Sequence, residues 1–299
     1  MARPDEIRLC AEDALLAELL KEVPLPKGGA LGPGDDCAAI PAARAGEMVL
    51  LKTDCIAEDV HFRRGDDPAL VGWKALCRPL SDIAAMGGVP GQALVTFFSP
   101  PDLEGGYWRK FYRGLGRAAR KFGVAIAGGE MSRQINGIAV SVALTGTVAK
   151  NQLVQRSGGR AGDLVFVTGR LGGSIRGKHL RFEPRLKEGR WLARQGFAAA
   201  MMDLSDGLGS DLPRLARASG CGFAIDAAAI PKNRGCSLDR AISDGEDYEL
   251  LFAVRPAKAE RLRRAWAKAF PKVPLSCIGK LTREKNTPAG WRGGWDHFG

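Results

Sequence analysis

Acidic residues beside glycines, or at the expected ends of strands, are the side chains of this sequence best suited to chemistry. If several converge, each close pair of carboxylates repels by about 4 kcal/mol at an effective dielectric constant near 20. Such a cluster requires cations, and ligation by carboxylate oxygens alone suits Mg²⁺ or Mn²⁺ rather than zinc. The acidic residues in question are Asp35, Asp36, Asp54, Asp82, Glu130, Asp203, Asp206 and Glu246.

The stretch 50–62, LLKTDCIAEDVHF, shows this pattern most clearly. Its apolar run predicts a buried strand that ends at Asp54, and Glu58, Asp59 and His61 follow in a polar turn. Open α/β sheets commonly bind ligands at the carboxyl ends of their strands. A strand followed by a solvated acidic loop would explain this stretch as well, and His61 alone is typical of a surface histidine. The interpretation as a site therefore depends on the other stretches that repeat the pattern.

The common nucleotide-binding and catalytic motifs are absent from the sequence. It has no GxxxxGK[ST] loop, no kinase HRD and DFG pair, no HExxH and no GxSxG. GLGRAA at 114–119 falls inside an expected helix rather than after a strand, so it does not indicate a dinucleotide site. Phosphate binding would therefore depend on metals, glycine-rich backbone turns and arginines.

Hydrophobic periodicity predicts a first half that mixes helices and strands. The expected helices are 11–22, 67–87 and 104–122, and the expected strands are 48–53, 92–99, 123–130 and 139–148. We expect Pro79 to break the second helix, so that a fresh turn begins at Ser81 and Asp82. The run at 123–130 predicts a buried strand that ends at two glycines and Glu130.

The polar stretch 150–162 predicts a domain boundary, which gives domains 1–150 and 151–299. The second half restarts with a strand at 163–169. An apolar run at 197–203 leads to Asp203 and Asp206 and then to a helix, with Ser205 as its expected N-cap. Acids precede a strand at 245–254, and a basic helix follows at 256–270. Both halves therefore indicate α/β or α+β domains that share a cleft.

Composition and charge indicate an ordinary globular protein. The chain has 299 residues, of which 45% are hydrophobic and 26% charged, and its net charge is +11. The basic residues are dispersed at helical spacing without a nucleic-acid motif, so we expect no nucleic-acid partner. Seven scattered cysteines without a CxxC pair favour reduced thiols. No secretory leader or membrane span is evident, which predicts a cytoplasmic protein without a membrane partner.

Eight motifs occur in an order that resembles a known enzyme family. They are GPGDD, TDCIAEDVHF, LSDIAAMG, AGGEMSR, RSGGRAGD, DLSDGL, GEDYELLF and GWDHF, between residues 32 and 298. Together they are similar to thiamine-monophosphate kinase, within the wider aminoimidazole ribonucleotide synthetase-like superfamily. The resemblance implies a two-domain superfamily fold with a shared cleft, a homodimer formed through the N-terminal halves, and phosphorylation of thiamine phosphate by ATP with several Mg²⁺ ions.

The resemblance also implies roles for individual residues. Positions that match metal ligands are Asp36, Thr53, Asp54, Asp82, Glu130, Asp203 and Asp206, of which Asp54, Asp82 and Asp206 are the expected catalytic set. Positions that match ATP contacts are Tyr112, Gly129, Glu130, Arg156 and Ser205. Positions that match contacts to thiamine phosphate are His61, Glu246 and Trp295.

Three residues depart from the pattern of the family. Glu130 stands where aspartate is usual, Asp244 where glycine is usual, and Lys52 where a small hydroxyl residue is usual. We hypothesise that the ammonium group of Lys52 replaces one weakly held Mg²⁺. Two alternatives remain: an ATP-using enzyme of the same superfamily with another acceptor, and a non-catalytic protein that binds nucleotide or nucleic acid.

Overall fold

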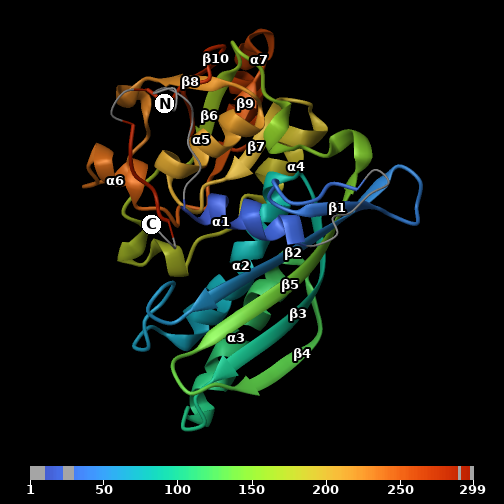
Figure 1. Ribbon diagram of the computed structural model, residues 1–299, viewed down its shortest axis with the longest axis vertical. Helices are drawn as coiled ribbons and strands as arrows, with labels where there is room; N and C mark the ends of the chain where they lie inside the picture. The colour runs from blue at the N-terminus through green and yellow to red at the C-terminus, as the bar shows by residue number, and fades with distance from the viewer. Residues whose placement is uncertain (1–10, 23–29, 289–290, 297–299) are drawn as a thin grey trace.

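Two sheets, one in each half of the chain, form the framework of this computed structural model (Figure 1). The structure describes residues 11–22, 30–288 and 291–296. Figure 1 shows the two halves stacked along the long axis, with helix α1 (Ala11–Leu19) at their junction. Predictions that concern residues 1–10, the start of the glycine-rich loop at 27–29 and residues 297–299 lie outside the described residues.

Among the described residues, the sheet of the first half has the order β1-β2-β5-β3-β4, and α2 and α3 cover one face. Its elements are β1 (Ala38–Pro41), β2 (Glu47–Ala57), α2 (Pro68–Ala85), β3 (Val89–Ser99), α3 (Gly105–Phe122), β4 (Ala125–Arg133) and β5 (Ala139–Ala149). These bounds confirm the predicted strands at 92–99 and 139–148 and the predicted helix at 104–122. The helix predicted at 11–22 is also confirmed, as α1 followed by the 3-10 turn η1 (Leu20–Glu22).

Strand β2 corrects the prediction that a buried strand ends at Asp54. It pairs with β5 without interruption from Glu47 to Ala57, so Asp54 lies inside the strand and its partner is Val142. Alternation along a strand sends Thr53 and Asp54 to opposite faces of the sheet. The polar residues after Ala57 begin the loop, because the pairing with β5 ends there.

Strand β4 corrects the prediction of a buried strand at 123–130. Every residue of β4 is exposed, and the strand continues past the two glycines to Arg133. In the described sheet β4 is an edge strand beside β3, and its residues are exposed on both faces, so apolar residues such as Ile126 and Met131 face solvent. A β-carbon at Gly129 would meet the carbonyl oxygen of Val95 at 1.9 Å, so the close approach of the two strands requires glycine there.

Helix α2 corrects the predicted break at Pro79, because it continues without interruption through this residue. Proline inside a helix costs about 3 kcal/mol. Burial of most of the helix, Pro79 included, offsets that cost. A β-carbon at Gly114 of α3 would meet the carbonyl oxygen of Ala69 at 1.8 Å, so α2 and α3 pack closely. At its other end, α2 places Ala84 and Ala85 in a core that belongs mainly to the second half.

Among the described residues, the sheet of the second half has the order β7-β9-β6-β10-β8. Its strands are β6 (Leu164–Thr168), β7 (Ala198–Asp203), β8 (Gly222–Ile225), β9 (Leu250–Val254) and β10 (Leu275–Thr282). Its helices are α4 (Leu186–Arg194), α5 (Leu208–Ala218), α6 (Leu238–Ser243) and α7 (Pro256–Ala269), and short 3-10 turns η2 to η6 lie between Lys150 and Ala229. The strand predicted at 163–169 and the helix at 256–270 are confirmed.

Ser205 is not the N-cap that the sequence predicted. Helix α5 begins at Leu208, and its N-cap is Gly207, whose φ of 98° favours glycine. Two residues earlier, Ser205 lies in the turn that follows β7, and its hydroxyl donates to the carboxylate of Asp206 at 3.4 Å. The turn therefore presents both side chains to the space between the two halves.

In the part of the chain that is described, no helix combines the length and the apolar character needed to cross a bilayer. The described cysteines are all free thiols, and Cys37, Cys77 and Cys221 are buried.

Candidate active site

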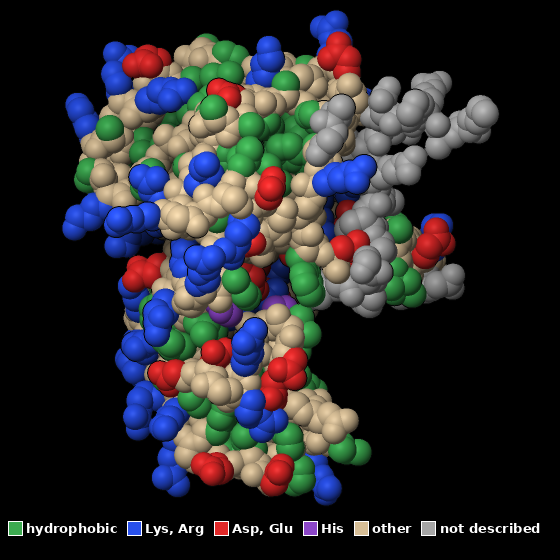
Figure 2. Space-filling view, turned by 90° about the vertical axis from the view of Figure 1, so that its left-hand side faces the viewer, with side chains coloured by type: hydrophobic (Ala, Val, Ile, Leu, Met, Phe, Trp, Pro, Cys, Tyr) green, Lys and Arg blue, Asp and Glu red, His purple; other side chains and the backbone are tan. Residues whose placement is uncertain are grey.

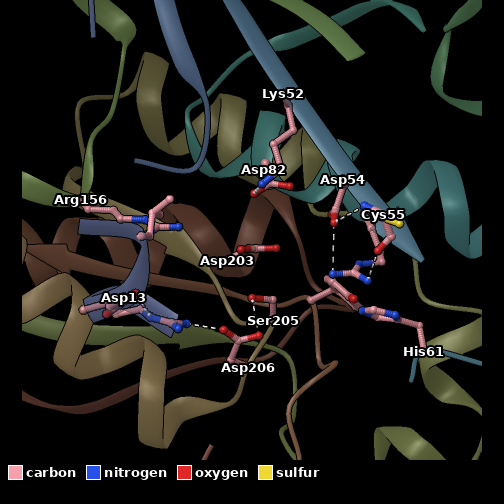
Figure 3. A pocket seen from close by; sticks show the side chains of 14 residues that line it. Asp13, Lys52, Asp54, Cys55, His61, Asp82, Arg156, Asp203, Ser205 and Asp206 are labelled. Carbon is pink, nitrogen blue, oxygen red and sulfur yellow. Dashed lines mark hydrogen bonds and ion pairs between the residues drawn. The ribbon is translucent and has the colours of Figure 1, made fainter. Parts of the chain in front are cut away.

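A cavity of about 630 Å³ opens between the two halves. Figure 2 shows the molecule hollowed at this junction, and Figure 3 shows the side chains that point into the cavity. We name it the carboxylate cavity after its acidic lining. Its charged lining consists of Asp13, Lys52, Asp54, Arg78, Asp82, Arg156, Asp203, Asp206 and Arg214.

Regular elements hold most of these carboxylates in place. Lys52 and Asp54, two residues apart on β2, both reach into the cavity, and Asp82 belongs to the last turn of α2. Asp203 is the last residue of β7, and Asp206 lies in the turn that follows it. The prediction that acids from both halves of the chain meet is therefore confirmed for these residues.

Three buried carboxylates form the centre of the site. Asp36, Asp82 and Asp203 each offer an oxygen, and the three oxygens lie within 4.8 Å of one another. Burial and the charge of Asp36 raise the pKa of Asp203 to about 7, and burial raises the pKa of Asp82. An all-oxygen donor set of this kind fits a hard divalent cation such as Mg²⁺.

Fixed cations accompany four of the acids. Lys52 Nζ forms an ion pair with Asp82 at 2.7 Å. Arg156 donates to the carboxylate of Asp36 from Nη2 at 2.8 Å and from Nε at 3.1 Å. Burial opposes the charge of Lys52, but Asp82 and Asp54 outweigh it and raise the pKa of Lys52. Two further pairs join Arg78 to Asp54 at 3.2 Å and Arg214 to Asp206.

Two predicted metal ligands do not reach this cavity in the described chain. The hydroxyl of Thr53 lies on the other face of the sheet, 3.3 Å from that of Ser141. Glu130 on β4 pairs with Thr96 on β3. Thr96 in turn pairs with Ser141 on β5, and Ser141 pairs with Cys55 on β2, which lines the cavity. Glu130 therefore lies three strand spacings, or roughly 14 Å, from Cys55 along the sheet.

The predicted ATP contacts divide in the same way. Arg156 and Ser205 line the carboxylate cavity. Gly129 lies on the edge strand β4, and Tyr112 lies on α3 with 37% of its surface exposed. Neither residue lines the carboxylate cavity of the described chain.

A smaller cavity of about 260 Å³ adjoins the first. We name it the aromatic pocket, because Trp295 forms part of its wall. Its lining residues are Val60, His61, Arg78, Ile175, Ser205, Asp206, Asp244, Glu246 and Trp295. The backbone N–H of Trp295 donates to the carbonyl oxygen of Asp206 at 2.8 Å, which places the tail beside the turn after β7. The three predicted contacts to thiamine phosphate thus lie together.

The carboxylate of Glu246 is held by donors from both halves of the chain. Lys74 of α2, whose side chain is 0% exposed, pairs with Oε2, and His179 Nδ1 lies 3.1 Å from the same oxygen. The hydroxyl of Tyr248 donates to Oε1 at 3.0 Å. Burial opposes the charge, yet His179 and Lys74 lower the pKa of Glu246 to about 2. Glu246 has a φ of 56°, a left-handed conformation that tertiary contacts must maintain.

His61 belongs to the walls of both cavities. Its Nδ1 accepts the backbone N–H of Ala57 at 3.0 Å, so the neutral ring carries its proton on Nε2. Burial and the charge of Arg78 lower the pKa of His61 to about 3. His61 therefore acts as a neutral hydrogen-bond donor.

Sequence reasoning missed Lys74, Arg78 and Arg214. The first two lie on α2 at intervals of four residues before Asp82, on a helix whose other described residues are mostly apolar and buried. Charged residues at that spacing inside a buried helix are a signal in the sequence, since they share one face. Among the departures, Asp244 lines the aromatic pocket, and its Oδ2 accepts the N–H of Gly173 at 2.7 Å.

Comparison with known proteins identifies the family. The family model of the AIR synthase related protein N-terminal domain matches residues 34–148, and that of the C-terminal domain matches residues 145–291. The thiamine-monophosphate kinase of Rhodopirellula baltica is 36% identical over 270 residues, which cover 84% of this chain and 83% of that protein. The chain belongs to the thiamine-monophosphate kinase family. The Escherichia coli relative of the same name is 31% identical, with 97% and 98% covered.

Solved structures of this family share the fold. The structure described as "AaThiL complexed with AMPPCP and TMP" has a TM-score of 0.81 and 30% identity, and covers 97% of this chain and 99% of that chain. Thiamine-monophosphate kinase from Stenotrophomonas maltophilia has a TM-score of 0.75 and 27% identity, with 94% and 96% covered. The predicted family and its two-domain α/β fold class are confirmed.

Proposed function

We propose that this chain transfers the γ-phosphoryl group of ATP to the phosphate of thiamine phosphate, giving ADP and thiamine diphosphate. The observation that carries this proposal is the junction of two cavities with different chemistry. One cavity offers carboxylates for metal-bound polyphosphate, and the other offers an aromatic ring and a fixed negative charge. The names of the relatives, and the AMPPCP and TMP of the solved relative, support the choice of substrates.

In this reaction a phosphate oxygen of thiamine phosphate attacks the γ-phosphorus of ATP. The bond from that phosphorus to the β,γ-bridging oxygen breaks, and its electron pair leaves with ADP. The attacking oxygen is already ionised at neutral pH, so the chain has to position and neutralise two polyanions rather than supply a general base. Several Mg²⁺ ions, when bound, would neutralise part of the charge on the phosphates and so lower the repulsion between the two substrates.

We assign the Mg²⁺ ions to the carboxylate cavity. Asp36, Asp82 and Asp203 would form the central ligand set, and Asp54 and Asp206 would extend it along the phosphates. Among these, Asp54, Asp82 and Asp206 remain the proposed catalytic set. The proposal for Lys52 is that its ammonium, held at Asp82, takes the place of one weakly bound ion.

ATP would contact Arg156 and Ser205, both of which line the carboxylate cavity. Arg156 supplies a fixed positive charge there. The roles expected for Thr53, Tyr112, Gly129 and Glu130 remain predictions, since these side chains do not line the cavity of the described chain.

Thiamine phosphate would place its cationic ring in the aromatic pocket. Glu246 keeps its negative charge there, and Trp295, which is 51% exposed, stands beside the opening. A cation–π contact with Trp295 would contribute about 0.5–2 kcal/mol to binding. The Nε2–H of His61 would donate to the acceptor near the shared wall.

We also propose a homodimer formed through the first half of the chain. Several large apolar side chains are exposed on its sheet, namely Leu51, Leu94, Ile126 and Met131. Leu51, Thr53 and Leu94 line an apolar groove of about 490 Å³ on this surface. In this proposal residues 1–150 supply the dimer contacts and part of the ATP and metal sites, and residues 151–299 complete the sites.

The test is an assay with ATP, Mg²⁺ and thiamine phosphate, in which chromatography detects thiamine diphosphate. We expect product from the wild-type chain and loss of turnover in Asp54→Asn. A matched control is Asp102→Asn, since Asp102 is exposed and lines neither cavity. ATP binding without product would reject the proposal in favour of another acceptor or of a non-catalytic protein.

A further inference from the structure

Arg78 lies on α2 halfway between two residues of the proposed site. Lys74, one helical turn before it, fixes Glu246 in the aromatic pocket, and Asp82, one turn after it, belongs to the carboxylate set. Intervals of four residues place all three on one face of the helix, with a rise of about 6 Å per step. This face of α2 therefore runs from the aromatic pocket to the carboxylate cavity, and Arg78 lies where the two cavities meet.

The walls of both cavities share four residues: His61, Arg78, Ser205 and Asp206. The ring of His61 is neutral, as shown above, and Ser205 carries no charge. Asp206 is already paired with Arg214. Arg78 is therefore the positively charged member of the shared wall.

The guanidinium of Arg78 is held in a fixed position. Its Nη1 donates to the carbonyl oxygen of Cys55 at 2.9 Å, and its Nη2 pairs with Asp54 at 3.2 Å. Its Nε is buried without a hydrogen-bond partner. A guanidinium has more N–H groups than these two contacts use, and their planar arrangement matches two oxygens of a phosphate.

We propose that Arg78 binds the phosphate group of the acceptor and holds it at the junction of the two cavities. This inference rests on the proposed function and adds a contact residue to it. The ring of the acceptor occupies the aromatic pocket, and its phosphate oxygen must reach ATP in the carboxylate cavity. The phosphate therefore lies where the two cavities meet, beside the positively charged side chain of Arg78. The contacts of Arg78 with Asp54 and Cys55 hold the guanidinium in place when the phosphate binds.

The experiment compares the binding of thiamine phosphate with that of unphosphorylated thiamine, by isothermal titration calorimetry without ATP. The wild-type chain should bind thiamine phosphate more tightly than thiamine. Arg78→Met should lower this preference about tenfold or more, because hydrogen bonds to a charged group are lost, while the Kd of thiamine stays within about twofold. Arg78→Lys keeps the positive charge but lacks the paired N–H groups of the guanidinium, so it should retain part of the preference.

The matched control is Arg113→Met, which removes the same charge from an exposed position of α3 and should leave both Kd values unchanged. Circular dichroism checks that each variant is folded, and Arg78→Lys serves as the test if Arg78→Met does not fold. An unchanged preference in the folded variant would overturn the inference, as would an equal loss for both ligands. A change in Mg²⁺ affinity alone would overturn it too, since Arg78 would then act through Asp54.

The inference and the proposed function can fail separately. If the wild-type chain binds thiamine phosphate through Arg78 but forms no thiamine diphosphate, the proposed function is wrong and the role of Arg78 stands. If it forms thiamine diphosphate while the preference is independent of Arg78, the proposed function stands and this inference is wrong.

Discussion

The two adjoining cavities treat buried carboxylates in opposite ways. In the carboxylate cavity, burial and mutual repulsion raise the pKa of Asp203 to about 7 and that of Asp82 in the same direction. In the aromatic pocket, Lys74, His179 and Tyr248 surround Glu246, and His179 and Lys74 lower its pKa to about 2 in spite of burial. The first cavity has more carboxylates than fixed cations, which leaves negative charge for cations from solution, whereas in the second Lys74, His179 and Tyr248 already surround Glu246.

This difference separates the tasks of the two cavities. The carboxylates of the first cavity outnumber its fixed cations, so a divalent cation would stabilise them, and the carboxylate cavity suits metal-bound ATP. The carboxylate of Glu246 is already ionised and paired with Lys74, so it needs no metal ion, and the aromatic pocket suits an organic ring. Neutralising one acid in each cavity should therefore destabilise the chain to different extents and have different effects on kinetics.

The largest expected effect is the loss of turnover in Asp82→Asn. The variant removes one of three central oxygen ligands, and kcat should fall roughly 100- to 1000-fold, as when one preorganised charge-stabilising group is deleted. Without metal, its free energy of unfolding should fall less than that of Glu246→Gln, because relief of the repulsion with Asp203 offsets the loss of the ion pair with Lys52. Urea unfolding and steady-state kinetics measure the two quantities. Retained turnover would show that Asp82 is not a functional metal ligand.

The next effect is a loss of both acceptor affinity and stability in Glu246→Gln. Removing the charge leaves the buried ammonium of Lys74 without its ionic partner, which should cost about 1–3 kcal/mol of unfolding free energy or more. KM for thiamine phosphate should rise about tenfold, with KM for ATP unchanged within about twofold. A variant as stable as the wild-type chain would remove the contrast between the two cavities.

A smaller change is expected in the metal content of Lys52→Ser. If the ammonium occupies the place of an ion beside Asp82, the variant should bind one more Mg²⁺ per chain, because the local negative charge is no longer compensated. Equilibrium dialysis in the presence of an ATP analogue measures the stoichiometry directly. Lys21→Ser is a matched control, since Lys21 is exposed and lines neither cavity. The same stoichiometry in both variants would reject the hypothesis.

The smallest expected signal is the absence of a titration at His61. Its pKa is about 3 in the folded chain against an ordinary value of 6.5, so its NMR resonances should not move between about pH 5 and 8. As the pH falls through 6.5 towards 3, the unfolded chain takes up this proton first. The contribution of His61 to stability is thus complete above pH 6.5 and is lost at lower pH. A titration midpoint near 6.5 would contradict the neutral-donor role.

Much of this arrangement is predictable from sequence because it follows from local patterns. Strand and helix periodicity gave most elements, and the acids near strand ends and turns gave Asp54, Asp203 and Asp206. The alternation of side chains along β2 also separates Thr53 from Asp54, although the family pattern had grouped them as ligands. The role of Thr53 therefore remains a prediction, whereas the side chain of Asp54 lies in the carboxylate cavity.

The errors came from contacts between distant segments. Pro79 remains in a helix because both halves bury α2, and β4 lies at the edge of the described sheet with both faces exposed. The role of Lys74 depends on Glu246, which is 172 residues away in the sequence. No local pattern contains that information.

The most direct test of the central claim follows labelled phosphate through a single turnover. The wild-type chain is mixed with ATP labelled in the γ-phosphate, Mg²⁺ and excess thiamine phosphate, and the products are separated by chromatography. Transfer between the two cavities predicts that the label appears in thiamine diphosphate in amounts equal to the ADP formed, and that removal of Mg²⁺ abolishes it. Label found in inorganic phosphate, with none in thiamine diphosphate, would contradict the account.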